Sequence, residues 1–575
     1  MSAPSASRRS GPSVFAGRLA ARGRSLLPAL LILAAGVAVY SNTFSVPFVF
    51  DDLHNIRDNL AIRTWWPPWG VLQQGRPVPQ YTFALNYAVH GYDVWGYHLV
   101  NLAIHLTGGL LLYGIVRRTL SRTELPVRWG PMTDQLALVI ALVWTVHPLQ
   151  TQAVTYIVQR HESLMGMLFL ATFYVFLRAQ EAARPWPWYG AAIGFCVLGL
   201  ATKEVMAAAP LLVLWYDRVF ISGSWREMIE RRKGFYAGLL ATYVLLAPLA
   251  INLMTGHHRE RLEHDGVVVV EGLTPWTYLV SQSGVIVHYL RLCFWPRGQC
   301  IDYGWPVAEG VSEVLPQALV VLALLGATVW CVFRRPRLSF LGGWFFLILA
   351  PTSSFVPIAD LAVEHRMYLP LAAVATAATL GGGIVLVRAG RHDRAAAIAT
   401  LASAVVVTAV LGVVAFNRNY VYASPYTLWS DVVAKRPDNA RGLYNLGRTE
   451  YDAGRYEAAM QLSLRAIALD PKRAQAYNNA GLAIEKLGRA EEAMGYYRRA
   501  LKLDPKCAEA HLNLGKLLRF NEPAEAMERF RLALHFKPHY SEAHNNLGAI
   551  LVRSDPQLAE KHYQLALQHD PSNAE

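Results

Sequence analysis

Two adjacent carboxylates, Asp51 and Asp52, follow directly on the first strongly apolar segment of the chain. The apolar run over 26–44 is long enough to cross a bilayer, so the pair lies where a helix would leave the membrane. Carboxylates at such a place can serve as general bases or as ligands for a divalent ion. The alternative is an ordinary solvated loop. Because charged side chains beside a membrane segment are rarely kept without a use, the pair is the leading candidate for chemistry.

Other polar motifs interrupt the apolar part of the chain. Lys203-Glu204 divides a long hydrophobic stretch, and Glu364-His365-Arg366 precedes another one. Each has a structural alternative, because a turn between two spans can also carry charged side chains that reach the interface. Together with Arg76 and Arg160, these motifs would share one side of the membrane in the topology given below. Their convergence on one face predicts a site better than any single motif does.

The composition is that of an integral membrane protein. The chain has 575 residues, of which 53% are hydrophobic and 17% charged, and its mean hydropathy is +0.23. The net charge of +13 does not indicate nucleic acid binding, since the arginines cluster in short connections between apolar runs, as the positive-inside rule predicts. The five cysteines have no spacing typical of a zinc site or a disulfide framework.

Hydrophobic runs predict eleven membrane spans in the inner membrane of the cell. A basic segment over 1–25 precedes them and is expected to stay in the cytoplasm as part of an uncleaved signal anchor. The segment 276–295 is apolar but carries His288 and Arg291, and we predict that it re-enters the membrane or lies at its surface. The odd number of spans would then place the carboxyl-terminal region on the outer face with the aspartate pair. The predicted spans are 26–44, 97–116, 134–152, 162–179, 186–201, 204–220, 235–254, 315–333, 338–354, 367–387 and 395–416.

The carboxyl-terminal region is charged, alanine-rich and repetitive, with a glycine that recurs every 33 or 34 residues. In each repeat an alanine stands twelve residues before a closing proline. This pattern is typical of tetratricopeptide repeats, in which small residues let paired helices pack closely and proline ends the second helix. The expected fold is all-α, with a polytopic helix bundle over 26–423 and a tetratricopeptide-repeat α-solenoid over 424–575. The four clear repeats lie near 440–471, 474–505, 508–538 and 541–571.

An asparagine occupies the same place in every repeat, at Asn445, Asn479, Asn513 and Asn546. In this repeat type the position lines the concave groove, where a carboxamide can donate to and accept from a peptide backbone. These residues are therefore candidates for binding an extended acceptor peptide. The alternative is that they are solvated polar residues without a ligand. Protein binding by the superhelix as a whole is the more general prediction.

Several short motifs recur in an order that resembles one known family. They are Phe50-Asp51-Asp52-Leu53-His54-Asn55-Ile56, Gly75-Arg76-Pro77-Val78, Asn86-Tyr87, Tyr97-His98-Leu99-Val100-Asn101, Ala201-Thr202-Lys203-Glu204 and Glu364-His365-Arg366-Met367-Tyr368-Leu369-Pro370, followed by the repeats. In this order they resemble the transmembrane-and-tetratricopeptide-repeat O-mannosyltransferases and their prokaryotic relatives. The motifs are moderately specific singly, and the similarity extends over nearly the whole chain.

The resemblance implies a C-type glycosyltransferase fold and the transfer of a sugar, a mannose-like hexose, from a polyprenyl-phosphate carrier on the outer face. It implies that Asp51 or Asp52 is catalytic, as a general base toward a Ser or Thr hydroxyl of an acceptor protein. Direct displacement would invert the anomeric centre. Adjacent side chains point in different directions, so one aspartate would be the base and the other would orient it or bind a divalent ion. The sequence contains no further oxygen-ligand spacing for a metal.

The leaving lipid phosphate would require positive charge on the same face. The predicted partners are thus a lipid-linked sugar donor and an acceptor protein, and the pattern requires no cofactor. Two alternatives stay open: a lipid-linked transferase with a lipid or glycan acceptor, and a membrane-anchored repeat scaffold without enzymatic activity, which would leave the ionisable residues without a role. The candidates for binding the donor or its phosphate are Arg76, Arg160, Lys203, Glu204, Glu364, His365 and Arg366.

Overall fold

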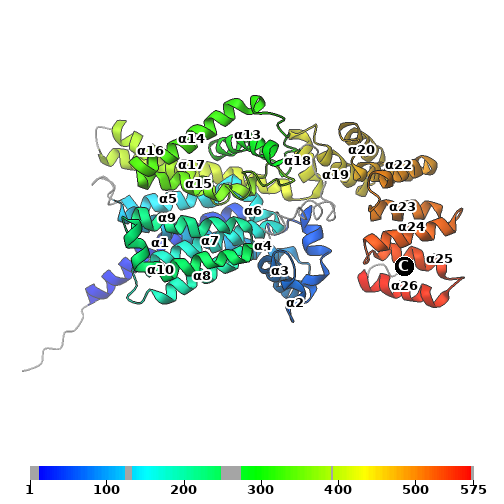
Figure 1. The fold of residues 1–575 in the computed structure, drawn as a ribbon, viewed down its shortest axis with the longest axis horizontal. Helices are drawn as coiled ribbons and strands as arrows, with labels where there is room; N and C mark the ends of the chain where they lie inside the picture. The colour runs from blue at the N-terminus through cyan, green and yellow to red at the C-terminus, as the bar shows by residue number, and fades with distance from the viewer. Residues whose placement is uncertain (1–11, 124–131, 248–272, 390–392, 571–575) are drawn as a thin grey trace, which may run out of the picture. The chain divides into compact units, whose positions relative to one another are not determined.

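The computed structural model describes residues 12–123, 132–247, 273–389 and 393–570. Every regular element within these ranges is helical, which confirms the all-α prediction (Figure 1). The chain divides into two compact units, one formed by Met1–Ile301 and Trp305–Ser424 and the other by Asp302–Gly304 and Pro425–Glu575. We refer to them as the membrane unit and the repeat unit. Residues 1–11 of the predicted cytoplasmic segment lie outside the described ranges.

The membrane unit is built from helices that range from single turns to 29 residues. Short helices and turns between α1 and α4 form the loop that carries the aspartate pair. The helices are α1 (Pro12–Tyr40), α2 (Trp69–Leu72), α3 (Pro77–His90), α4 (Val94–Arg122), α5 (Thr133–Val146), α6 (Thr151–Thr155), α7 (Arg160–Ala179), α8 (Trp186–Leu200), α9 (Ala208–Phe220), α10 (Trp225–Ala241), α13 (Pro275–Phe294), α14 (Leu315–Arg334), α15 (Pro336–Leu349), α16 (Pro370–Ala389) and α17 (Asp393–Asn419).

Four helical segments of the described residues are long and apolar enough to cross a membrane, so the chain is an integral membrane protein. A fifth is obtained if the pair Thr133–Val146 and Pro148–Thr155, bent by 51°, counts as one span. Shorter apolar helices occupy Leu26–Tyr40, Trp186–Leu200, Pro336–Leu349 and Pro370–Val385, where the sequence also predicts spans. The end of the predicted span 235–254 lies outside the described residues. The four long candidates are Val94–Arg122, Ile157–Ala179, Val311–Arg334 and Ala402–Tyr422.

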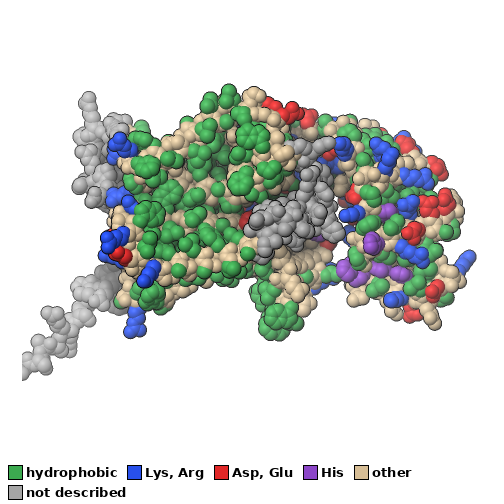
Figure 2. Space-filling view, viewed as in Figure 1, with side chains coloured by type: hydrophobic (Ala, Val, Ile, Leu, Met, Phe, Trp, Pro, Cys, Tyr) green, Lys and Arg blue, Asp and Glu red, His purple; other side chains and the backbone are tan. Residues whose placement is uncertain are grey.

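Hydrophobic side chains cover a broad face of the membrane unit (Figure 2). On α14, Leu322 and Phe333 are 62% and 80% exposed, and only 11% of the apolar window of this helix is buried. Helix α7 has the opposite character, with 83% of its window buried. An outer helix can be apolar on all sides because lipid, rather than water, is its solvent. The exposed apolar surface therefore marks where the unit contacts the bilayer.

Small residues let the inner helices approach one another closely, as in other membrane helix bundles. A Cβ atom added at Gly109 of α4 would lie 2.6 Å from the hydroxyl of Thr145 on α5. At Gly166 of α7, an added Cβ would overlap the ring of Tyr368. The same tyrosine receives hydrogen bonds at its backbone carbonyl, including one from the indole N–H of Trp144 (2.7 Å). These contacts tie α4, α5 and α7 to the segment that precedes α16.

The repeat unit consists of one leading helix and four antiparallel helix pairs, which confirms the tetratricopeptide prediction. The leading helix is α18 (Pro425–Lys435). In each pair, the first helix carries the recurrent glycine and the second carries the alanine and ends before the closing proline. The pairs are α19 (Ala440–Asp452) with α20 (Tyr456–Leu469), α21 (Ala474–Lys486) with α22 (Ala490–Leu503), α23 (Ala508–Leu518) with α24 (Pro523–Phe536), and α25 (Ser541–Leu551) with α26 (Pro556–His569).

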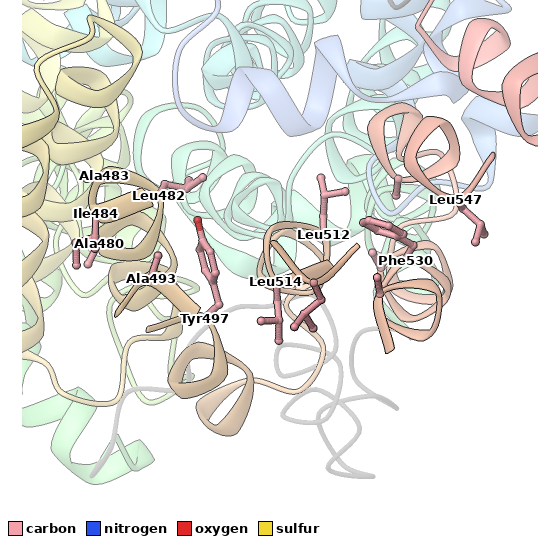
Figure 3. Close-up of a cluster of buried hydrophobic side chains, with 14 of the residues drawn as sticks. Ala480, Leu482, Ala483, Ile484, Ala493, Tyr497, Leu512, Leu514, Phe530 and Leu547 are labelled. Atoms are coloured by element: carbon pink, nitrogen blue, oxygen red, sulfur yellow. The ribbon is translucent and has the colours of Figure 1, made fainter. Parts of the chain in front are cut away.

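The core of the repeat unit is built from small residues that face large ones (Figure 3). Tyr497 and Phe530 are fully buried, and each packs against the glycine of its own repeat. A Cβ atom added at Gly481 would lie 2.6 Å from the Tyr497 ring, and one at Gly515 would lie 2.7 Å from the Phe530 ring. A larger residue at either glycine would therefore force the paired helices apart. This is the physical reason for the glycine periodicity seen in the sequence.

Candidate active site

The two aspartates lie in a tight turn after α1, and they have different surroundings. Phe50, just before them, has a φ angle of 50°, in the left-handed region that non-glycine residues seldom adopt. Asp52 is fully buried, and its two carboxyl oxygens accept hydrogen bonds from the backbone N–H groups of Val49 (3.0 Å) and Val158 (2.7 Å). Burial raises the pKa of Asp52 to about 8. The Asp52 side chain therefore fastens the turn to the segment that leads into α7.

Asp51 is half-buried and contacts Tyr156 on that same segment. The Asp51 N–H donates to the Tyr156 hydroxyl (2.8 Å), and the hydroxyl also forms a hydrogen bond with the Asp51 side chain. Tyr156 is 1% exposed, so its ring is fixed by packing. A carboxylate oriented by a rigid phenol and open to solvent on one side has the placement that a general base requires.

Arg160, in the first turn of α7, is fully buried and donates to acceptors of the protein itself. Its guanidinium donates to the side-chain oxygens of Asn101 (2.6 Å), Asn86 (2.6 Å) and Thr82 (3.2 Å) and to the carbonyl of Tyr97 (3.0 Å). The guanidinium also lies over the ring of Phe83, 4.5 Å from its centre. The arrangement makes Arg160 the hub that joins α3, α4 and α7.

Basic side chains gather beside this hub, and we refer to Arg76, His161, Lys203 and His365 as the cationic cluster. The charges of Arg76 and Lys203 act on both histidines. Arg76 is 41% exposed at its side chain and donates to Glu204 (3.3 Å), which the sequence also predicts at the site. The structure thus brings together four residues predicted from sequence (Arg76, Lys203, Glu204 and His365) and adds His161.

Two imidazole nitrogens of the cationic cluster have no hydrogen-bond partner among the described residues. They are Nε2 of His161, whose side chain is buried, and Nδ1 of His365. Burial, followed by the charges of Lys203 and Arg366, lowers the pKa of His365 well below its usual range. A neutral imidazole has one N–H group, so a vacant nitrogen can donate to an anion only when it carries that proton. His365 can adopt this tautomer, whereas His161 bonds to the Val158 backbone through its other ring nitrogen. A buried polar atom without a partner in the protein can be satisfied by a water molecule, an ion or a ligand.

The lysine of the cluster is held by a buried acid. Lys203 donates to Glu162 with an Nζ–Oε2 distance of 2.6 Å, and the two side chains are 7% and 3% exposed. Glu162 is not among the residues predicted for the site, although it lies in the same run as Arg160. This ion pair fixes the position of the ammonium group, whose charge acts on the two histidines.

Glu364 and Arg366, also predicted for donor binding, contact groups of the protein itself. Glu364 is fully buried and accepts hydrogen bonds from the Cys300 N–H (2.6 Å) and from Gln299 (2.9 Å), and it forms an ion pair with Arg418 (3.4 Å). Arg366 donates to the carbonyls of Leu361 (2.8 Å) and Asp360 (2.6 Å). Both residues therefore fix the backbone on either side of His365.

The four asparagines of the repeat unit use their amide groups within the unit. Asn445 and Asn546 donate to the carbonyls four residues earlier in their own helices, at 2.9 and 2.7 Å. Asn479 donates to the Tyr444 carbonyl (3.2 Å) in the preceding repeat, and Asn513 donates to the side chain of Asn478 (3.0 Å). Asn445 and Asn479 are half-buried, whereas the other two are buried.

No group of three or more His, Cys, Asp or Glu side chains in the described ranges is arranged to hold a metal ion. Tyr156, Glu162 and His161 are absent from the residues predicted for the site, and they all lie on the segment 156–162. The sequence did contain a signal for His161 and Glu162, because they belong to Gln159-Arg160-His161-Glu162, a polar run between apolar segments. A tyrosine in an apolar segment carries no such signal.

Known proteins share parts of this sequence. Residues 74–251 match the family described as dolichyl-phosphate-mannose-protein mannosyltransferase, and residues 447–488 and 486–518 match the TPR repeat. Protein O-mannosyl-transferase Tmtc3 of Drosophila melanogaster is 25% identical over an alignment 522 residues long, gaps included, which covers 78% of this chain and 55% of that protein. The human proteins TMTC3 and TMTC4, also described as protein O-mannosyl-transferases, are 23% and 24% identical, over 76% and 75% of this chain and 50% and 65% of their own lengths.

The chain is an integral membrane protein with tetratricopeptide repeats. Part of its membrane unit is similar to the dolichyl-phosphate-mannose-protein mannosyltransferase family. More particularly, it is a distant homologue of the TMTC O-mannosyltransferases, and it spans about half the length of the curated relatives it matches. Among solved structures, the crystal structure of MamA covers 28% of this chain and 92% of that chain at 24% identity, with a TM-score of 0.23, which is too low to carry an argument.

Proposed function

We propose that this chain transfers a mannose-like hexose from a polyprenyl-phosphate carrier to Ser or Thr hydroxyls of acceptor proteins on the outer face of the membrane. The observation that carries the proposal is the segment 156–162, which contacts both aspartates near its start and Lys203 at its end. A base for the acceptor and a cation for the leaving phosphate are the two parts that such a transfer needs. The family match over residues 74–251 supports the same interpretation.

Asp51 is the better candidate for the base. Both oxygens of Asp52 already accept backbone hydrogen bonds, whereas Asp51 is half-buried beside the Tyr156 hydroxyl. In the proposed step, Asp51 takes the proton of the acceptor hydroxyl as its oxygen bonds to the anomeric carbon, and the bond from that carbon to the phosphate oxygen breaks. The configuration inverts because attack and departure occur on opposite sides. Tyr156 orients the base, and Asp52 holds the turn.

The cationic cluster would bind the lipid phosphate. Arg76 is the most accessible of its cations and can offer two parallel N–H donors to a phosphate. Lys203 supplies a point charge, and His365 can donate to a phosphate oxygen when its proton is on Nδ1, the nitrogen that has no partner in the described structure. Arg160 would act on the site only through its contacts with α3 and α4. A divalent ion beside the aspartates stays an alternative source of positive charge.

The topology of the proposal has eleven spans, a cytoplasmic amino terminus and an outer repeat domain. Arg117 and Arg122 lie at the end of α4 remote from Asn101, which contacts the Arg160 hub, and basic residues favour the cytoplasmic side. We expect a reporter fused after residue 575 to be active outside. A cytoplasmic signal would require α13 or another segment to cross, and it would place the repeats away from the site.

The repeat unit would present the acceptor protein to the membrane unit. Its superhelix offers the concave groove typical of peptide-binding repeats, and Asn445 and Asn479 are the half-buried members of the asparagine series. Because their Nδ2 atoms donate within the unit, the contact with a peptide would use their side-chain oxygens. We expect Asn445→Ala with Asn479→Ala to raise KM for the acceptor and to leave KM for the lipid donor unchanged.

The proposed activity is tested with purified chain in vesicles that contain polyprenyl-phosphate mannose and an acceptor protein, with sugar transfer followed by mass spectrometry. Arg76→Gln should raise KM for the lipid donor several-fold, because it removes one of the cations that would bind the phosphate. Arg57→Gln is the matched control, since Arg57 lies in the same loop, is exposed and pairs only with its neighbour Asp58 among the described ion pairs. Absence of transfer by the unmodified chain with any hexose, or equal effects of the two variants, would reject the proposal.

A further inference from the structure

The membrane unit contains a crevice with a volume of about 350 Å³. Helices α4, α7, α9, α15 and α16 contribute its walls. Most of the lining is apolar and includes Val116, Phe173 and Leu341. The hydroxyl groups of Thr119 and Tyr216, 2.8 Å apart, form a hydrogen bond with each other at the wall. The crevice is therefore suited to a long apolar chain rather than to a sugar.

The crevice is remote from the candidate active site. Asn101, which contacts the Arg160 hub, and Leu120, which lines the crevice, are on the same helix α4. They are nineteen positions apart, which at about 1.5 Å per residue corresponds to roughly 28 Å, close to the thickness of the hydrocarbon core. The crevice thus belongs to the opposite leaflet, at the end of α4 that carries Arg117 and Arg122.

A cation lies at the edge of the crevice. Among the described residues, Arg337 is the one charged residue of the lining, and Arg334 and Arg335 precede it in the turn between α14 and α15. The three side chains are exposed, and no carboxylate of the described residues forms an ion pair with them. A cationic side chain in the lining of an apolar crevice, with two further arginines two and three residues before it in the chain, matches an amphiphile with an anionic head and a hydrocarbon tail.

We propose that this crevice binds one anionic glycerophospholipid of the inner leaflet. One acyl chain occupies the apolar space between α4 and α16, and the phosphate is bound by Arg337 with help from Arg334 or Arg335. The bilayer supplies this ligand at high local concentration, and its single phosphate needs no sugar-binding group. Occupancy also fills a void between five helices, which stabilises their packing. The proposal is independent of the transfer reaction, because the two sites lie at opposite ends of α4.

The test uses the full chain in vesicles of phosphatidylcholine and phosphatidylglycerol in a 4:1 ratio, followed by native mass spectrometry of the lipids that stay bound after gentle extraction. We expect one phosphatidylglycerol retained in preference to phosphatidylcholine. Arg337→Gln should reduce that preference by about tenfold, which corresponds to the loss of one charge-assisted hydrogen bond. Ala373→Leu, which fills the crevice, should abolish retention.

Ala377→Leu is the matched control, since Ala377 is exposed on the same helix and is not part of the lining. It should retain the lipid as the unmodified chain does. Equal retention of the two phospholipids by the unmodified chain would overturn the proposal, and so would retention unaffected by both Arg337→Gln and Ala373→Leu. A third vesicle that also contains polyprenyl phosphate separates the sources: preferential retention of the polyprenyl lipid would overturn the assignment to a glycerophospholipid.

Discussion

Exchange of each aspartate for asparagine should produce two different kinds of defect. A positioned general base contributes about 10²–10⁴-fold to rate, so Asp51→Asn should lower kcat by that factor. At about 1.4 kcal/mol per tenfold, this corresponds to roughly 3–5 kcal/mol of activation free energy. Because the asparagine still fits beside Tyr156 and the backbone contact from residue 51 is unchanged, the melting temperature and KM for the donor should stay near their original values.

Asp52→Asn should act on stability first. The two Asp52 oxygens accept from the N–H groups of Val49 and Val158, whereas an amide offers one oxygen and one N–H₂ group. One buried backbone N–H then faces a donor and loses its acceptor, at a cost of about 1–3 kcal/mol in the free energy of unfolding. Transfer would fall as well, because the turn that carries Asp51 is no longer fastened to the segment before α7.

The assay compares both variants with Asp58→Asn, whose parent carboxylate lies in the same loop and pairs with Arg57 at the surface. Steady-state transfer in vesicles gives kcat and KM, and intrinsic fluorescence in detergent gives the melting temperature. Asp58→Asn should match the unmodified chain in each measurement. A normal kcat for Asp51→Asn would refute the assignment of the base. Loss of transfer by Asp52→Asn without any change in melting temperature would show that Asp52, rather than Asp51, performs the chemistry.

Three further predictions concern the described structure. Lys203→Met leaves Glu162 buried without its partner, so the melting temperature should fall by an amount equivalent to about 3–5 kcal/mol, and the double variant with Glu162→Gln should recover much of that loss. Gly515→Leu should destabilise the repeat unit by about 1–3 kcal/mol, whereas Gly495→Ala, with open space around its Cβ position, should leave protease resistance of the repeats unchanged. Burial raises the pKa of Asp52 from 3.8 to about 8, so the folded chain keeps a proton that the unfolded chain has lost. The associated stability is complete below about pH 4 and is lost as pH rises toward about 8, and thermal melting should follow this slope in the unmodified chain and less steeply in Asp52→Asn.

The regular parts of the fold were predictable because they repeat a simple pattern. The glycine of each repeat reports a close contact with one aromatic ring, as between Gly515 and Phe530, and this contact recurs with the same spacing. Apolar runs predicted the positions of helices equally well. They did not determine how many helices cross the membrane, because α8 and α15 are apolar but short, and hydropathy alone does not distinguish a short span from a buried helix.

The sequence indicated several residues of the candidate site, but it did not indicate the role of each residue. The sequence placed Asp51, Asp52, Arg76 and Lys203 on one side of the membrane, but it contains no information on which charged groups already have partners. Burial distinguishes these residues. The side chains of Asp52 and Arg160 are buried and hydrogen-bonded within the protein, whereas those of Asp51 and Arg76 are partly exposed. Such differences arise from contacts between segments about a hundred residues apart, as between Asp52 and Val158.

Those distant contacts also determine when, during synthesis, the candidate site can form. The loop after α1 is tied by Asp52 to Val158 and by Asn86 and Thr82 to Arg160, so its partners emerge from the ribosome about 75–110 residues after it. Until the segment that leads into α7 is in place, the loop lacks these partners, and the carboxyl of Asp52 has no second N–H group to bind. Assembly of the site is thereby coupled to insertion of the helix that starts at Arg160, and an incompletely inserted chain lacks it.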